Sequence, residues 1–411
     1  MKYEDKLEYF KEALNLYLPS IVSNYTYEIV EENDKLPDDD GTLSLKLPLE
    51  EIQKQVVVFH IKNMTEYELY VLQVIIASMG LFFKKDLDEL FFMGNVKRSI
   101  QFAIANIMSE KSPARSFFLL DLFQKWSSET YEGNRISSSI GCVNSDNGAI
   151  SLHPNFFDED FLKVLTSGRD TILVFDGNLV PVGYEPLSEN EDDSQLFSPV
   201  SFIPIASWSK NNDFAISLNR NGEILCFKNG SLAFAHRRGL WIGFSHEAYI
   251  KGMSEDGGCD SDLCRALYLT MLDVSFRRTG GCLGVLSSGR KEEYATLIAE
   301  QDRFTENPRS DKSRFLKTIL KEYKRFQDIP RKLRQELVGI DGATIVDERG
   351  ELLCVGAIIE IPGGSTGGGG RTAAAKAIAK YGLGIKISND GKIQYWKKRE
   401  PGDEEPAYTI G

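Results

Sequence analysis

In the stretch IPGGSTGGGGRTAAAKAIAKYG, from Ile361 to Gly382, six glycines precede an arginine that opens an alanine-rich segment. A glycine-rich loop that runs into a helix leaves backbone N–H groups unpaired beside the positive end of the helix dipole. Proteins commonly bind phosphate groups at such helix starts. Because similar composition also occurs in flexible linkers, the stretch alone leaves a linker as the alternative interpretation.

A second short motif, Asp341-Gly342-Ala343, stands between a predicted helix and a predicted strand. A carboxylate followed by glycine lets a ligand approach the backbone, and it suits a metal ion or a ribose hydroxyl. Asp and Gly are also common turn formers, so a plain turn is the alternative.

The order of these motifs is more informative than either motif alone. Asp341-Gly342-Ala343, an acidic turn, a long strand and the glycine loop precede Arg371, which opens a helix. This order resembles the diadenylate cyclase (DAC) domain family, in which an Asp-Gly-Ala motif precedes a Gly-x-Arg-His-Arg-x-Ala motif. The resemblance covers roughly Ser261 to Trp396, and its strongest match is LVGIDGATIVDERGELL, Leu337 to Leu353. It implies an α/β fold with a mixed β-sheet flanked by helices.

The resemblance also implies a site and a cofactor. In the family, two ATP molecules are joined into cyclic di-AMP with a divalent metal ion, which implies Mg²⁺ or Mn²⁺ with the bound nucleotide. Asp341 would be the metal ligand, and the catalytic carboxylate if the protein is active. The expected nucleotide-binding residues are Asp341, Gly342, Ala343, Gly367, Gly368, Gly369, Gly370, Arg371 and Thr372. Catalytic members act as face-to-face dimers, so a homodimer would accompany activity.

One departure from the family motif decides between receptor and enzyme. Arg371 matches the second arginine, whereas the first arginine and the histidine fall on Gly369 and Gly370. Loss of a charge-stabilising group at a phosphoryl-transfer site commonly costs orders of magnitude in rate. The sequence therefore favours a nucleotide sensor similar to the degenerate DACNV-type group. We expect this sensor to bind an adenine nucleotide or a nucleotide second messenger and to signal to its N-terminal region.

Two alternatives to the sensor remain. The first is an active diadenylate cyclase, a nucleotidyltransferase in which Arg277, Arg278 or His236 makes up for the missing side chains. The second is an interaction scaffold that binds no nucleotide. The identity of the ligand, the downstream protein partner and the oligomeric state do not follow from the sequence.

Composition limits the other classes of function. The net charge of −12 argues against general binding to nucleic acid or to a membrane surface, which requires a basic field. The cysteines form no CxxC pair and several lie in apolar runs, which predicts buried thiols and a reducing compartment. The longest apolar run, Leu69 to Phe83, is shorter than the roughly 20 residues that span a bilayer. With no signal peptide recognised at Met1, we expect a cytoplasmic location.

Changes of pattern along the chain predict four regions. Residues 1–140 are a mostly helical N-terminal region, and residues 145–255 form a β-rich segment whose hairpins turn at Asn221-Gly222 and Asn229-Gly230. Residues 256–397 form the DAC-like nucleotide-binding domain, and residues 398–411 are a polar tail. Within the third region we expect a capped, buried helix from Asp262 to Arg278. Further helices are expected over 292–300 and 313–326, the latter with an apolar face that includes Phe315 and Ile319.

Other candidate sites are weaker. The segment HRRG, His236 to Gly239, could form a phosphate clamp or a solvated turn, and the solvated turn is favoured. The segment SSGR, Ser287 to Arg290, follows a strand and ranks second to the glycine loop as a phosphate site. The glycine loop is not a Walker A motif, because Ser365 and Arg371 stand where glycine and lysine are required. The four histidines are too scattered to suggest a zinc site.

Overall fold

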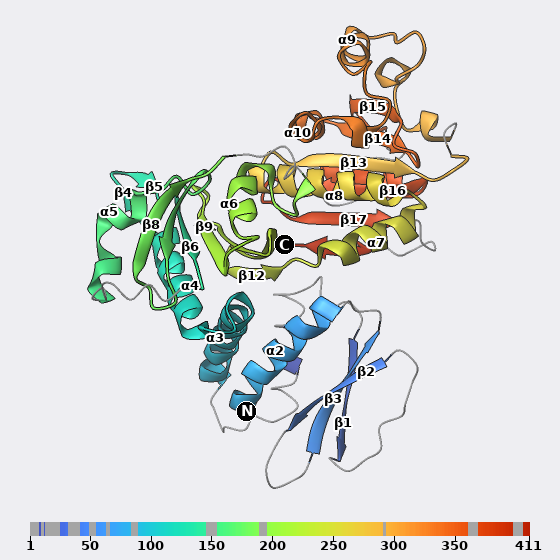
Figure 1. The fold of residues 1–411 in the computed structure, drawn as a ribbon. Coiled ribbons are helices and arrows are strands. Elements are labelled where there is room, and N and C mark those ends of the chain that lie inside the picture. The colour runs from blue at the N-terminus through green and yellow to red at the C-terminus, as the bar shows by residue number, and fades with distance from the viewer. Residues whose placement is uncertain are drawn as a thin grey trace. The chain divides into compact units, whose positions relative to one another are not determined.

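The structure is a computed structural model (Figure 1) that describes residues 8–9, 12, 25–31, 42–48, 55–62, 66–83, 89–144, 154–188, 195–290, 293–360, 369–397 and 406–411. Contacts divide the chain into two compact units. Unit 1 consists of residues 1–196 and 202–245, and unit 2 consists of residues 197–201 and 246–411. Both units combine helices with mixed sheets, which confirms the predicted α/β class.

Unit 1 contains a small antiparallel sheet, three long helices and a large mixed sheet. The small sheet has the order β1-β3-β2, from strands β1 (Tyr25–Glu31), β2 (Thr42–Pro48) and β3 (Gln55–Lys62). The long helices are α2 (Glu66–Phe83), α3 (Glu89–Met108) and α4 (Pro113–Ser127), and the short ones are α5 (Asp160–Val164) and α6 (Ile203–Trp208). A short hairpin joins β4 (Thr130–Tyr131) to β5 (Asn134–Arg135).

The large sheet of unit 1 has the order β12-β11-β10-β9-β6-β7-β8. Its strands are β6 (Ser138–Cys142), β7 (Thr171–Phe175), β8 (Pro181–Pro186), β9 (Phe214–Leu218), β10 (Ile224–Lys228), β11 (Ser231–Arg237) and β12 (Leu240–Gly243). Strands β6 and β7 are parallel, and the other neighbours are antiparallel. Asn229 and Gly230 both have positive φ, 52° and 78°, so the predicted Asn-Gly hairpin turn is confirmed.

The helices and the large sheet of unit 1 share one hydrophobic core. Buried residues of α2, α3 and α4 belong to the same cluster as buried residues of β6, β7, β9, β10 and β11. The predicted boundary between a helical region ending at 140 and a β-rich region starting at 145 therefore falls inside unit 1.

Unit 2 is built on a sheet with the order β15-β14-β13-β16-β17-β18. Its strands are β13 (Gly281–Leu286), β14 (Ala343–Asp347), β15 (Leu352–Ala357), β16 (Gly382–Ile387), β17 (Ile393–Lys397) and β18 (Tyr408–Ile410). Its helices are α7 (His246–Gly257), α8 (Ser261–Arg277), α9 (Asp311–Ile319), α10 (Arg331–Gly339) and α11 (Gly370–Ala379). Strands β13 and β14 are parallel, and the other neighbours are antiparallel.

Helices cover both faces of this sheet. A Cβ atom added at Gly281 would meet Val274 of α8 and Val338 of α10, whereas one at Gly284 would meet Ile378 of α11. Because side chains alternate along a strand, residues 282, 284 and 286 of β13 face α11. Gly384 lies opposite Gly284 in β16, and a Cβ atom there would overlap the carbonyl oxygen of Ala375. These two glycines let α11 pack closely against the sheet.

Helix α8 begins as the sequence predicts. The Asp260 carboxylate accepts a hydrogen bond of 2.7 Å from the Leu263 N–H, which satisfies an otherwise unpaired donor at the helix start. Nearly every residue of α8 is buried. The helix is therefore the capped, buried element that the apolar pattern indicated.

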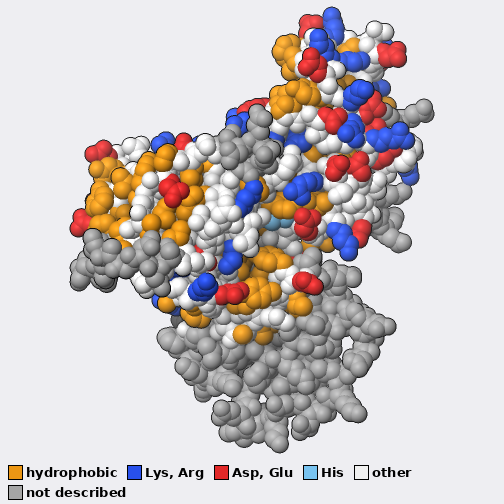
Figure 2. Space-filling model, in the orientation of Figure 1, with side chains coloured by type: hydrophobic (Ala, Val, Ile, Leu, Met, Phe, Trp, Pro, Cys, Tyr) orange, Lys and Arg blue, Asp and Glu red, His pale blue; other side chains and the backbone are white. Residues whose placement is uncertain are grey.

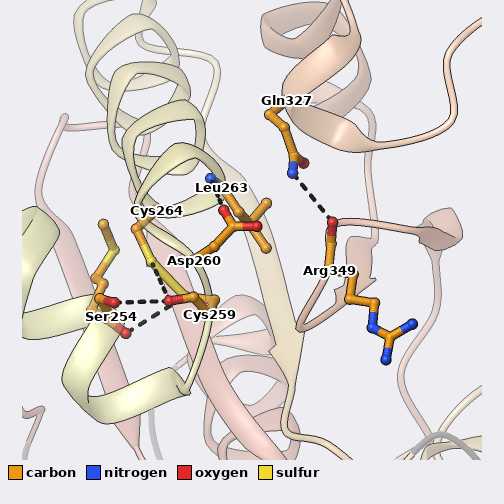
Figure 3. The surroundings of a disulfide bond; sticks show 8 residues. Ser254, Cys259, Asp260, Leu263, Cys264, Gln327 and Arg349 are labelled. Carbon is orange, nitrogen blue, oxygen red and sulfur yellow. Dashed lines mark hydrogen bonds between the residues drawn. A yellow bond between two sulfur atoms is a disulfide. The ribbon is translucent and has the colours of Figure 1, made fainter.

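The start of α8 also contains a correction. Cys259 and Cys264 form a disulfide (Figure 3), which the expectation of buried thiols in a reducing compartment did not include. The Ser254 hydroxyl donates to the Cys259 carbonyl at 2.8 Å beside it. Cys142, Cys226, Cys282 and Cys354 are buried thiols, as predicted. The disulfide removes part of the support for a reducing compartment.

Three further expectations in unit 2 need correction. Residues Glu293–Thr296 and Glu300–Asp302 form short 3₁₀ turns instead of an α-helix. Helix α9 ends at Ile319, and the expected apolar face is only partly buried, because Phe315 and Ile319 are 64% and 42% accessible whereas Leu320 is 5% accessible. The predicted polar tail includes β18, which pairs with β17 at the edge of the sheet.

The described surface carries charged side chains of both signs. On the face in Figure 2, Lys and Arg side chains are interspersed with Asp and Glu side chains over the described surface. In the described part of the chain, none of the helices is both long and apolar enough to cross a bilayer.

Candidate functional site

A cavity of about 550 Å³ lies at one edge of the unit 2 sheet, where β13 and β14 begin and β15 and β16 end. The loop before β14 contributes Asp341, Gly342 and Ala343 to its lining. The start of α11 contributes Gly369, Gly370, Arg371 and Thr372. The fold therefore brings together the two motifs that the sequence singled out, although Gly367 and Gly368 lie outside the described residues.

Gly342 has a backbone conformation that requires glycine. Its φ angle is +104°, and an added Cβ atom would lie 2.6 Å from the Gly356 carbonyl oxygen. Asp341, beside it, is exposed at the cavity. The tight turn and the access to the backbone that the motif suggested thus occur at the same place.

The start of α11 presents backbone donors to the cavity. Gly369 is the N-cap and has no side chain to cap the helix, and its carbonyl accepts hydrogen bonds from Thr372 N–H at 2.9 Å and Ala373 N–H at 3.3 Å. The N–H groups of Gly370 and Arg371 precede these first helical bonds. They lie at the positive end of the helix dipole, where an anion is stabilised.

Arg371 is positioned by a neighbouring loop. Its guanidinium donates a hydrogen bond to the Asn389 side-chain oxygen, at the turn after β16. Gly280, with φ +69°, leaves the space that both side chains occupy, because a Cβ atom there would collide with them. The partner of Arg371 is a neutral amide, so its positive charge remains available to a ligand.

Cys282 also lines the cavity, but it does not have the properties of a nucleophile. Burial raises the pKa of its thiol to about 12, although the nearby Arg371 charge lowers it in part. A thiol with such a pKa stays protonated at neutral pH and reacts poorly.

Sequence reasoning missed several cavity residues, among them Lys386 and Asn389. Lys386 lies directly opposite Cys282 in the β13–β16 pair, so both side chains are on the face covered by α11. Its ammonium makes no hydrogen bond or ion pair with the described residues. The alternation in GLGIKIS already places Lys386 on the same face as Gly384, but only the strand pairing brings it to Arg371.

The weaker candidate sites lie elsewhere. In unit 1, Arg237 forms a buried ion pair with Glu223, with 2.5 Å between Nε and Oε1, and the two side chains are 4% and 2% exposed. The prediction of a solvated turn is wrong for Arg237, and its charge is already neutralised. Burial lowers the pKa of His236 to about 4, so this imidazole is neutral at pH 7.

Within unit 2, neither Ser287 nor Arg277 is part of the cavity lining. Ser287 follows the other end of β13, where its N–H donates to the Tyr381 carbonyl at 2.9 Å. The Arg277 guanidinium pairs with Glu336, and Arg278 adopts φ 65° where α8 ends. None of Ser287, Arg277 and Arg278 is among the residues that line the cavity with Asp341 and Arg371.

The residues present do not form a metal site by themselves. Over the ranges that the structure describes, no three or more His, Cys, Asp or Glu side chains are grouped to hold a metal ion. Asp341 contributes a single carboxylate to the cavity. Metal dependence therefore stays a prediction.

Comparison with known proteins gives a likeness to solved structures only. No family model and no curated protein matches the chain. Part of the chain is similar to the crystal structure of a double mutant of DacA from Staphylococcus aureus, with 16% identity over 36% of this chain and 85% of that chain. The TM-score is 0.23, which is too low to assign a shared fold or a function.

Proposed function

We propose that unit 2 binds an adenine nucleotide or a nucleotide second messenger and that the protein is a sensor of this ligand. The observation that supports the proposal is the single cavity that collects Asp341-Gly342-Ala343 and the start of α11. Its volume of about 550 Å³ lies within the range of about 300–1,000 Å³ typical of small-molecule sites.

A phosphate group is the part of such a ligand that the cavity suits best. Arg371 offers a planar set of donors, Lys386 offers a second positive charge, and the α11 start offers backbone N–H groups. Asp341, which also lines the cavity, would accept a hydrogen bond from a ribose hydroxyl. Ile358 and Ile359 add an apolar surface for a base, and Ile358 is 61% exposed.

The proposed role is binding without efficient chemistry. Gly369 and Gly370 place no side chain near the phosphate, and Asn389 already holds Arg371. Transition-state stabilisation in phosphoryl transfer requires several positioned cations and donors. The specific observation in favour of the alternative, a diadenylate cyclase, is Lys386, which could replace one of the missing cations.

We propose that a short segment, residues 197–201, which we call the strap, transmits ligand binding to unit 1. The chain enters unit 2 at Phe197, forms the strap, and returns to unit 1 at Phe202. Val200 N–H donates to Asp273 Oδ1 at 2.7 Å, and Arg331 donates to the Ser198 carbonyl. The strap is thereby fastened to α8 and α10.

Both of these helices lead directly to the cavity. Helix α8 is followed by Gly280, which makes space for Arg371, and α10 is followed by Asp341. A ligand-induced shift of either loop would therefore act on the helices that hold the strap. This is a hypothesis about coupling, and it needs a measured response of the strap to the ligand.

Binding is tested by isothermal titration calorimetry of the full chain with ATP, AMP and cyclic di-AMP. Arg371→Ala and Lys386→Ala should each weaken the preferred nucleotide tenfold or more, because each removes a charged hydrogen bond to phosphate. Lys380→Ala, an exposed lysine at the other end of α11, is the matched control and should have no effect. Nucleotide binding that is unchanged in both cavity variants would place the phosphate elsewhere, and absence of binding would favour the scaffold.

Catalysis is tested by incubating the protein with ATP and Mn²⁺ and searching for cyclic di-AMP by mass spectrometry. We expect no product. Product that disappears in Asp341→Asn would establish the cyclase and contradict the sensor.

A further inference from the structure

Six of the seven strands in the large sheet of unit 1 have the same topology as the sheet of unit 2, and β12 has no counterpart there. The strand order β8-β7-β6-β9-β10-β11 in unit 1 corresponds to β15-β14-β13-β16-β17-β18 in unit 2. In each order, the second and third strands are parallel and all other neighbours are antiparallel. Along the chain, each sheet also has a long helix before its first strand: α4 precedes β6, and α8 precedes β13. A further helix precedes the fourth strand along the chain: α6 precedes β9, and α11 precedes β16.

The registers of the two sheets agree at β6, β7, β9 and β10 and at their counterparts β13, β14, β16 and β17. Gly141 in β6 lies opposite Ala215 and Val174, and Gly284 in β13 lies opposite Gly384 and Ile345. Both central glycines face the helix that precedes the fourth strand. An added Cβ atom would collide with Trp208 of α6 at Gly141 and with Ile378 of α11 at Gly284.

The hairpin after the parallel strand is also the same. In this register, Asp176 of unit 1 is the counterpart of Asp347 of unit 2. Asp176 Oδ1 accepts from Asn178 N–H at 2.8 Å and Val180 N–H at 3.0 Å. Asp347 Oδ1 accepts at the same offsets, from Arg349 N–H at 3.1 Å and Glu351 N–H at 2.8 Å.

The next hairpin repeats this agreement. In unit 1, Asn219 N–H donates to the Glu223 carbonyl at 3.0 Å, and Gly222 N–H donates to the Asn219 carbonyl at 2.9 Å. In unit 2, Ser388 N–H donates to the Lys392 carbonyl and Gly391 N–H donates to the Ser388 carbonyl, both at 2.8 Å. Asn219 and Ser388 are counterparts in the same register.

The sheet edge that borders the cavity in unit 2 is filled in unit 1. The register places Asp170 at the position of Asp341, Ser139 at that of Cys282, and Ser217 at that of Lys386. The Ser217 hydroxyl donates to the Gly168 carbonyl at 2.5 Å, and the Thr166 hydroxyl accepts from Ser139 N–H at 2.7 Å. Both serines are fully buried. The segment 166–170 thus occupies the edge that is open in unit 2.

We infer that unit 1 contains a second copy of the unit 2 fold, produced by internal duplication, in which the chain itself closes the ligand site. Strand order alone recurs among unrelated proteins, whereas the glycine register and two matched turns are independent features. Each chain therefore binds one nucleotide, in unit 2. The duplication does not depend on the proposed function. The stoichiometry of one nucleotide per chain rests on the proposed function.

The stoichiometry is tested by titrating the full chain with ATP, for which one equivalent per chain is expected. Asp170→Asn should change neither stoichiometry nor affinity by more than twofold. Lys386→Ser, which places the unit 1 residue in the unit 2 cavity, should weaken binding tenfold or more. Two equivalents per chain, with the second lost in Asp170→Asn, would show that the unit 1 site is open and would overturn the inference.

The fold itself is tested by a crystal structure of the full chain. Superposition of the matched strands should also align Asp176 with Asp347 and Gly141 with Gly284. An antiparallel β6–β7 pair, or a strand other than β9 beside β6, would overturn the duplication. If ATP does not bind while the strands superpose, the proposed function fails and the duplication stands.

Discussion

The large sheet of unit 1 and the sheet of unit 2 share strand order and turns, yet they differ at a few matched positions. Lys386 corresponds to the buried Ser217, and Gly384 corresponds to Ala215. His236, which is partly buried in β11, corresponds to Ile410 in β18. The comparison indicates that glycine contacts and hairpin turns maintain the architecture, while one edge of the sheet determines whether a ligand can enter.

The largest expected effect separates the two units by stability. Arg331 Nε and Nη2 both contact Asp273 at 2.7 Å, and the side chains are 5% and 0% exposed. Asp273→Ala should destabilise unit 2 by about 3–5 kcal/mol, because it leaves a buried arginine unpaired. Trp396 is the one tryptophan in the sequence of unit 2, so its fluorescence reports unfolding of that unit.

The matched control is Asp213→Ala in unit 1, where Asp213 pairs with the buried Arg115 at 2.6 Å. This substitution should lower the stability reported by the fluorescence of Trp126, Trp208 and Trp241. The unfolding transition reported by Trp396 should not change. Equal shifts of all signals in both variants would mean that the units do not unfold independently.

A second prediction distinguishes the copies by acid sensitivity. Burial lowers the pKa of His236 from 6.5 to about 4, so the unfolded state binds more protons between these values. The stability of unit 1 should therefore be complete above pH 6.5 and fall by up to about 3 kcal/mol as the pH decreases toward 4. Urea unfolding at several pH values measures this slope, and His236→Gln should flatten it. An unchanged slope in the variant would assign the acid sensitivity to another group.

The third prediction concerns the packing of the helix on each sheet. Gly384→Ala should destabilise unit 2 by about 1–3 kcal/mol, because its Cβ atom meets the α11 backbone. Ala215→Gly places the unit 2 residue in unit 1 and should cost about 1 kcal/mol through chain entropy and lost packing. Thermal unfolding monitored by tryptophan fluorescence compares the two. A neutral Gly384→Ala would show that α11 can move away from the sheet.

The smallest effect tests the equivalence of the hairpins. Asp176→Ala and Asp347→Ala each remove an acceptor of two backbone N–H groups, which should cost about 1–2 kcal/mol in the unit concerned. Chemical denaturation should give similar losses for the two variants. Losses that differ by much more than measurement error would argue against matched roles.

Local sequence signals predicted much of unit 2. The Asp260 cap, the buried pattern of α8 and the glycine loop before α11 are each readable within one short segment. Both cavity motifs were identified in this way, because their backbone chemistry depends on glycine at fixed positions.

Features that depend on distant partners were not predictable in the same way. Lys386 becomes a cavity residue only through its pairing with Cys282, and β18 becomes a strand only because β17 offers an edge. Apolar periodicity predicted that Phe315 lies on a packed helix face, but its side chain is exposed. The copy in unit 1 was missed because matched positions hold chemically different residues, such as Ser217 and Lys386.

The strap has a practical consequence for dissecting the protein. A fragment that begins at His246 contains all strands of the unit 2 sheet, but it lacks Ser198 and Val200. Arg331 and Asp273 would then lose their backbone partners from the strap in a buried environment. A separately expressed unit 2 would therefore have to retain residues 197–201, joined to the fragment by an artificial linker.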